Sequence, residues 1–136
     1  MDAEMNLQNE RLKAGYRSTA NKYLWACYVL LLIATIAPIY APFDSMPSFE
    51  SVEVWFQRSG ALTTVFALLT TLLRDMGMRT LHKPGHWGDA LKLEVLSEVE
   101  ARFEWIFWTA FTLTIIGTVV WGYGDTLYKF VILHQR

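Results

Sequence analysis

Residues 89–125 read DALKLEVLSEVEARFEWIFWTAFTLTIIGTVVWGYGD and give the strongest structural signal in the chain. Charged and apolar residues alternate at helical spacing as far as Glu104, whereas residues 105–123 are uncharged and mostly apolar. A run of roughly 20 apolar residues can cross the hydrocarbon core of a bilayer and exceeds the usual buried helix of a soluble domain. The sequence therefore predicts a cytoplasmic helix over 89–104 that continues into a transmembrane helix over 105–124.

The composition argues against an ordinary soluble protein. Of 136 residues, 53% are hydrophobic and 15% are aromatic, and the aromatic residues gather at the ends of apolar runs. Rings in such places are typical of the headgroup level of a membrane. The single cysteine, Cys27, lies in an apolar run, which excludes a disulfide framework and a cysteine-based zinc site. Residues 1–22 are polar and charged, so they hold no apolar core of a cleavable signal peptide.

Two further apolar stretches predict two further membrane crossings. The first opens with Tyr23 and Trp25 and ends near Pro38, where a helix kinks or stops. The second has an apolar part too short for a full crossing, so the predicted helix is extended back to Val52. The predicted order is a cytoplasmic amphipathic helix 1–22, a first transmembrane helix 23–41, an outer loop 42–51, a second transmembrane helix 52–74, a cytoplasmic connector 75–88, the helices 89–104 and 105–124, and an outer tail 125–136, with Gly122 and Gly124 ending the last helix.

The distribution of lysine and arginine predicts the orientation, because cytoplasmic segments carry an excess of these residues. Nine of the 12 fall on the side of the N-terminus in the predicted order and three on the other side. The sequence thus predicts an all-α, three-span protein with its N-terminus in the cytoplasm and its C-terminus outside. Three helices alone bury little surface, which favours a homo-oligomeric bundle.

Small residues recur at every fourth position of the third transmembrane helix. Such a series lets helix backbones approach closely, and lipid supplies no hydrophobic drive for helix association. Two interpretations stay open: a self-association seam between copies, or packing inside the three-helix bundle of one chain. The residues are Ala110, Thr114, Thr118 and Gly122.

The second transmembrane helix is rich in threonine on one broad face, which ends in Arg74 and Asp75. A stripe of hydroxyls that ends in a charge could line a hydrated path. The alternative is that each threonine donates to a carbonyl of its own helix and tolerates lipid. The candidate pore-lining residues are Thr63, Thr64, Ala67, Thr70 and Thr71.

Aromatic residues cluster at the cytoplasmic end of the third transmembrane helix. They are typical of an interfacial belt, and in a ring of copies they could instead close a hydrophobic constriction, since apolar rings gate by dewetting. The candidate gate residues are Trp105, Trp108 and Phe111.

Basic residues with rings nearby could bind an anionic ligand such as a lipid headgroup, a nucleotide or an oligonucleotide. The alternative is that cytoplasmic topology explains these charges and that the acidic face of Glu94, Glu98, Glu100 and Glu104 pairs with them. The candidates are Arg11, Lys13, Tyr16, Arg17, Arg74, Arg79, Lys83 and Trp87.

The remaining polar residues predict no catalytic or metal chemistry. His82 and His86 are separated by Pro84 and Gly85, which deny them the helical geometry that aims two histidines at one metal. We expect no metal, no cofactor and no enzymatic activity. At the predicted outer edge, the candidates for a charge pair are Glu53, Arg58 and Asp125.

Two strings carry a resemblance to a known group of proteins. They are FQRSGA at 56–61, which opens the second span, and GTVVWGYGD at 117–125, which closes the third. With the chain's size and layout they resemble bacterial inner-membrane effectors of nucleotidyltransferase-linked anti-phage defence, such as the effector of the Hailong system. The resemblance implies a homo-oligomeric, tetrameric ion channel held shut by a nucleic-acid oligomer that a partner cytoplasmic nucleotidyltransferase makes. Its opening would depolarise an infected cell.

The leading hypothesis is a homo-oligomeric pore or channel in a bacterial inner membrane, gated from the cytoplasm. One alternative is a non-conducting scaffold or accessory subunit that docks a soluble partner. Another is a holin-like lysis protein. In every case the partners expected first are the lipid bilayer and further copies of the chain.

Overall fold

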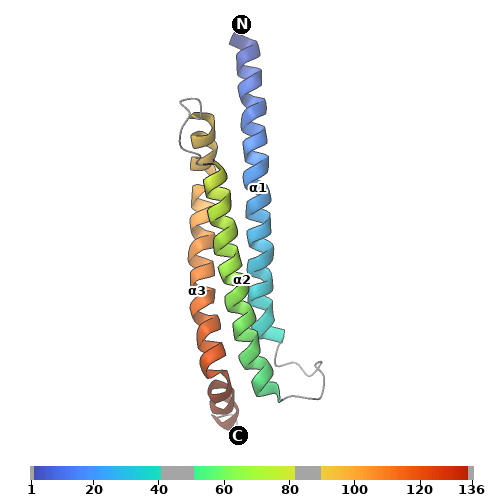
Figure 1. Ribbon diagram of the computed structural model, residues 1–136, viewed down its shortest axis with the longest axis vertical. Coiled ribbons are helices and arrows are strands. Elements are labelled where there is room, and N and C mark those ends of the chain that lie inside the picture. Colours follow the sequence, from blue (N-terminus) through green and yellow to red (C-terminus); the bar gives the residue numbers. More distant parts are fainter. Residues whose placement is uncertain (1, 41–50, 82–89, 135–136) are drawn as a thin grey trace.

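Three long α-helices make up the described part of the chain (Figure 1). The computed structural model describes residues 2–40, 51–81 and 90–134, which form α1 (Asp2–Tyr40), α2 (Val52–Leu81) and α3 (Ala90–His134). Each contains a segment that is long and apolar enough to cross a membrane. The predictions of an all-α fold and of three candidate membrane crossings are therefore confirmed, and they indicate a membrane protein.

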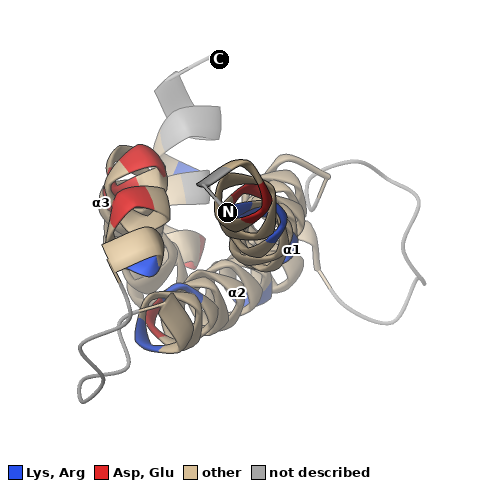
Figure 2. Cartoon of the chain, turned by 90° about the horizontal axis from the view of Figure 1, so that it is seen from above, with Lys and Arg blue, Asp and Glu red and all other residues tan. Residues whose placement is uncertain are grey.

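The three helices lie side by side, and each runs antiparallel to the next (Figure 1). α2 packs most extensively on α3 and also on α1, whereas α1 and α3 share the smallest contact. The first turns of α1 extend beyond the end of α2 and the start of α3 (Figure 1). Seen along the bundle, the helices form a triangle, and α3 carries a group of acidic residues (Figure 2).

α1 joins the predicted cytoplasmic helix and the predicted first transmembrane helix without interruption. Pro38 lies inside it, close to its end at Tyr40, which agrees with the expectation of a kink or stop there. The predicted outer loop 42–51 lies outside the described residues except for Ser51. The Ser51 carbonyl accepts hydrogen bonds from Val54 N at 3.0 Å and Trp55 N at 3.3 Å, which begins α2.

Two predicted helix ends are wrong. α2 continues to Leu81, so the first half of the predicted connector 75–88 is helical. α3 continues through Gly122 and Gly124 to His134, so glycine does not end it and the predicted outer tail is helical in its described part. A glycine costs about 1 kcal/mol relative to alanine inside a helix. Leaving backbone groups unpaired in lipid costs several kcal/mol each, so the helix persists.

A buried apolar cluster runs along the inner faces of the helices. The three helices meet at Gly77, where an added Cβ would lie 3.1 Å from Tyr23 Cβ on α1 and 3.3 Å from Phe103 Cζ on α3. Small residues in this region let the helices approach, and the largest side chains fill the space between them. The cluster consists of Ala20, Leu24, Cys27, Leu31, Leu81, Leu96, Val99, Phe103, Ile106 and Ala110.

Candidate functional site

The predicted threonine stripe faces the interior of the bundle. Thr63, Ala67 and Thr70 are at most 1% exposed, because this face of α2 packs on α1. Thr64 and Thr71 are half-buried. Within one chain the stripe therefore forms a dry helix contact.

The threonine hydroxyls are satisfied by backbone carbonyls. Thr64, Thr70 and Thr71 each donate to the carbonyl four residues earlier, at 3.0, 2.8 and 3.2 Å. This is the alternative that the sequence left open for these residues. Thr63 adds a contact between helices, since its Oγ1 lies 3.0 Å from Ser59 O and 2.9 Å from Ala34 O on α1. Such hydrogen bonds help to hold helices together in lipid.

α2 and α3 approach each other closely at a glycine crossing. A Cβ added at Gly60 would lie 2.5 Å from Trp121 N and 2.6 Å from Gly117 O. A Cβ added at Gly117 would lie 2.6 Å from Thr64 Oγ1 and 2.8 Å from Gly60 O. Only glycine permits such an approach of backbones. This crossing was not among the features predicted from the sequence.

A seven-residue repeat of small residues on α3 is the sequence pattern that could have predicted the glycine crossing. Ala110, Gly117 and Gly124 are all buried on the face of α3 that packs on the rest of the bundle. Gly124 approaches α2 as well, since its added Cβ would lie 2.9 Å from Gln57 Cα. A step of seven residues turns a helix by only about 20°, so these residues stay on one face.

The predicted four-residue seam does not lie on a single face. A step of four residues turns the helix by about 40°, so the series winds around α3. Ala110 is buried in the core of the bundle and Thr114 is half-buried, whereas Thr118 and Gly122 are exposed. The first two residues therefore pack inside one chain, and the last two remain on the outer surface of this chain.

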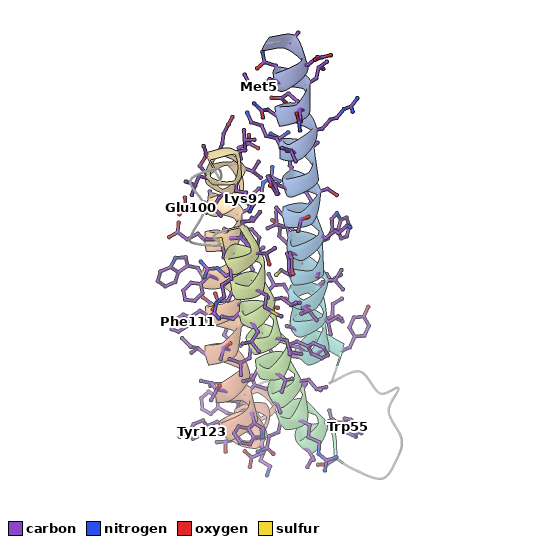
Figure 3. All side chains as sticks on the ribbon, turned by 45° about the horizontal axis from the view of Figure 1, so that its top comes forward. Met5, Trp55, Lys92, Glu100, Phe111 and Tyr123 are labelled. Carbon is purple, nitrogen blue, oxygen red and sulfur yellow. The ribbon has the colours of Figure 1, made fainter. Side chains whose placement is uncertain are left out.

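The candidate gate residues lie on the outside of α3. Trp105 is 60% exposed and Trp108 59%, and Figure 3 shows Phe111 pointing away from the other helices. Phe107 stacks on Phe111 at 6.3 Å and meets the edge of Trp108 at 5.6 Å between ring centroids. The structure therefore brings Trp108 and Phe111 together with Phe107, whereas the Trp105 ring lies 6.5 Å from the ring of Tyr28 on α1.

One stripe of α3 points directly away from the bundle. It begins at Trp108 and continues through Thr112, Ile115 and Val119, all of which are exposed. We call these four residues the α3 outer stripe. It combines an aromatic ring at one end with aliphatic and hydroxyl side chains along a helix of membrane-spanning length.

Arg74 joins the aromatic cluster from α2. Its guanidinium lies 5.2 Å from the Phe107 ring centroid, and its Nη1 donates to Asp75 Oδ1 at 2.9 Å. Its Nε is buried without a hydrogen-bond partner in the described structure. Arg74 is therefore held between a carboxylate and a ring rather than presented to water.

Two of the candidate anion-binding residues are already paired with α3. Arg17 donates two hydrogen bonds to the Glu98 carboxylate, from Nη2 to Oε1 at 2.8 Å and from Nε to Oε2 at 3.0 Å. Lys13 Nζ lies 2.8 Å from Glu94. This hydrogen bond raises the pKa of the Lys13 ammonium above its ordinary value of 10.5. The expected pairing of the acidic face with the basic residues is therefore confirmed for Glu94 and Glu98.

The other candidates are spread over the structure. Tyr16 lies under the ammonium of Lys92, 5.3 Å from its ring centroid, and Figure 3 shows Lys92 reaching towards α1. Arg11 and Arg79 are exposed on different helices. Lys83 and Trp87 lie outside the described residues, as do Asp89, His82 and His86. The eight candidates therefore form no single described cluster.

The outer charges have neighbours of their own. Arg58 lies over the Trp55 ring, 5.9 Å from its centroid. Asp125 Oδ1 accepts a hydrogen bond from Thr126 Oγ1 at 3.2 Å. The side chain of Glu53 lies outside the described part of the structure.

Comparisons with known proteins give no assignment: no family model, curated protein or solved structure matches the chain. Within the described ranges, no three His, Cys, Asp or Glu residues come together in a way that could hold a metal ion.

Proposed function

We propose that the protein is a homo-oligomeric membrane pore, controlled from the cytoplasmic side, in a bacterial inner membrane. The observation that carries the proposal is the α3 outer stripe. Among the described helices, none covers these four residues, and the helix that bears them continues into the part that is ion-paired with α1. A ring of copies that turn this face inward would enclose a path with tryptophan at its cytoplasmic end.

The packing of one chain supports an oligomer rather than a single-chain conduit. Large side chains such as Phe103 and Ile106 are fully buried between the helices, and interiors packed in this way leave no path for water or ions. The threonine stripe on α2 packs inside the bundle, with Thr63 on α1 and Thr64 on α3, so it is not part of the proposed pore wall. A conduit therefore needs walls supplied by several copies, with the α3 outer stripe facing the axis.

Gating would act through α3 as a rigid lever. Arg17 and Lys13 connect the start of α1 to Glu98 and Glu94, and α3 runs without a break from these residues to Trp108. A polyanion such as a nucleotide or a single-stranded oligonucleotide would compete with the two carboxylates for the same cations. Binding or release of this ligand would change the contacts between α1 and α3. A cytoplasmic nucleotidyltransferase would be the enzyme that makes such a ligand.

Cysteine accessibility tests the pore wall. In a Cys27→Ala background, Thr112→Cys places a thiol on the α3 outer stripe, and Leu32→Cys places a matched thiol on the exposed face of α1. A cationic thiol reagent is expected to reduce the current through Thr112→Cys severalfold in planar bilayers and to leave Leu32→Cys unchanged. Equal effects on both variants, absence of conductance with and without oligonucleotide, or a strict monomer in detergent would contradict the proposal.

A non-conducting scaffold is the second candidate. Met5 and Leu7 are exposed on the part of α1 that projects beyond the other helices, where Figure 3 shows Met5 standing alone. Exposed apolar residues on such a projection would suit a soluble partner. Overexpression separates the candidates: a pore should depolarise cells, a scaffold should not, and a holin-like protein should release cytoplasmic enzymes.

A further inference from the structure

A shallow hollow lies on the surface of α1 and is lined by residues of that helix. It has a volume of about 740 Å³ and is open to its surroundings. Six residues of α1 line it: Ala14, Arg17, Ser18, Asn21, Lys22 and Trp25. All six belong to one helix, so the hollow is formed by the sequence of α1 alone.

Helical geometry explains its shape. Ala14, Ser18 and Asn21 follow one another at spacings of four and three residues, so they make a strip of small and polar side chains. Arg17 and Lys22 stand on opposite sides of that strip. The lining is mostly apolar, with hydrogen-bonding groups supplied by Ser18 and Asn21 and one cation on each side.

The hollow lies at the boundary between the polar and the apolar part of α1. Trp25, which closes its lower end, is 71% exposed at the start of the apolar segment. Below it, the same face continues with Val29, Leu32 and Ile36, which are all exposed and apolar. A ligand that fits both halves has an anionic head and long hydrocarbon chains.

The two cations that line the hollow differ in their ion pairing. Arg17 is bound to Glu98, so its charge is largely neutralised. Lys22 is exposed and, among the described residues, takes part in no ion pair. Lys22 is thus the charge that an anion would meet, one turn above the ring that marks the headgroup level.

We propose that the hollow on α1 binds the headgroup of an anionic phospholipid. The phosphate lies between the Lys22 ammonium and the Ser18 and Asn21 donors, the Trp25 ring covers the glycerol region, and the acyl chains follow Val29, Leu32 and Ile36. A soluble phosphate compound gains nothing from the apolar track, and Lys22 repels the choline of a zwitterionic lipid. This lipid site requires a membrane but no ion conduction, so the proposal does not depend on the proposed pore function.

Lipid binding to the purified full-length protein, measured by native mass spectrometry in detergent, tests the proposal. Phosphatidylglycerol is expected to bind more tightly than phosphatidylcholine. Lys22→Gln should weaken phosphatidylglycerol binding about fivefold, since a basic residue near a lipid surface contributes about 1 kcal/mol. Lys22→Arg should retain it. Arg11→Gln is the matched control, because Arg11 is an exposed cation of α1 outside the hollow, and it should leave binding unchanged.

Three results would overturn the lipid site. They are equal binding of the two lipids, an equal loss in Arg11→Gln and Lys22→Gln, or displacement of phosphatidylglycerol by glycerol 3-phosphate at the same concentration. Displacement by a single-stranded oligonucleotide with loss of its binding in Lys22→Gln would reassign the hollow to nucleic acid.

Discussion

The two ends of the bundle are held together in different ways. At one end, α2 and α3 touch through backbone atoms at Gly60 and Gly117, and no side chain separates them. Towards the opposite end, α1 and α3 stay far enough apart for long side chains, and the Arg17–Glu98 pair bridges them.

The difference follows from the surrounding solvent. In lipid, apolar burial gives helices no drive to associate, so close backbone packing and hydrogen bonds must supply it. In water, charged side chains can bridge helices, but half-exposed ion pairs contribute only about 0–1 kcal/mol because solvent screens them. The glycine crossing is therefore expected to matter more for stability than the ion pairs.

The largest effect is expected from Gly117→Ala. The added methyl would overlap Thr64 Oγ1 and Gly60 O, and overpacking of this kind typically costs about 1–3 kcal/mol. The free energy of unfolding in mixed micelles, followed by energy transfer between labelled α2 and α3, measures the cost.

Gly122→Ala is the matched control for this crossing. It lies on the same helix, and a Cβ there meets nothing within 4 Å. The free energy of unfolding of Gly122→Ala should stay the same or rise by up to about 1 kcal/mol, because alanine favours a helix more than glycine does. Equal losses in both variants would show that backbone contact does not hold α2 to α3.

A smaller effect is expected from Thr63→Val, which keeps the side chain's shape but removes the hydroxyl near Ala34 O. Hydrogen bonds between membrane helices contribute about 0.6 kcal/mol on average and up to about 1.7. Thr118→Val is the control, because the Thr118 hydroxyl donates only within α3, to Thr114 O at 2.7 Å. In the same unfolding assay, only Thr63→Val should lower the free energy of unfolding. Equal decreases in both variants would show that the α1–α2 hydrogen bond does not stabilise the protein.

The Arg17–Glu98 pair should contribute less. A double-mutant cycle with Arg17→Gln and Glu98→Gln is expected to give a coupling of about 0.2–1 kcal/mol, because both side chains are nearly half exposed. The coupling should decrease as salt is added, whereas the cost of Gly117→Ala should not change. A coupling that does not depend on salt would indicate that the Arg17–Glu98 pair is shielded from water, in contradiction to its exposure in the structure.

The smallest effect is a pH dependence at Lys13. Its hydrogen bond to Glu94 raises the pKa of the ammonium above 10.5, so folding favours the protonated form. The contribution is fully present below the ordinary pKa and is lost as pH rises through the raised pKa. Hydrogen exchange of the first turns of α3 should therefore quicken beyond the intrinsic rate as the pH rises above 10.5, and Lys13→Gln should abolish this extra change.

Much of the fold could be predicted because hydropathy and helical periodicity are local properties. The uncharged run 105–123 is enough to predict a helix of spanning length, and the same holds for the first span. The helix ends were less predictable. Gly122 and Gly124 have the composition of a helix terminus, yet α3 continues through both, and Gly124 serves to let α2 approach.

The candidate site was harder to predict, because it depends on how each helix is rotated. Thr63, Ala67 and Thr70 share a face in any helix, but the sequence does not say whether that face meets lipid, water or another helix. In the structure it meets α1. The exposed positions of Trp105 and Trp108 likewise follow from which side of α3 the bundle covers.

The sequence by itself determined three apolar stretches, their helical character and the excess of cations near two of their ends, because each depends only on neighbouring residues and on the solvent around them. The tertiary structure decided which small residues touch and which charges pair. Gly60 meets Gly117 and Arg17 meets Glu98 only once three helices are fixed in rotation and height. Partners so far apart in the chain are selected by the packing of whole helices, which no local pattern contains.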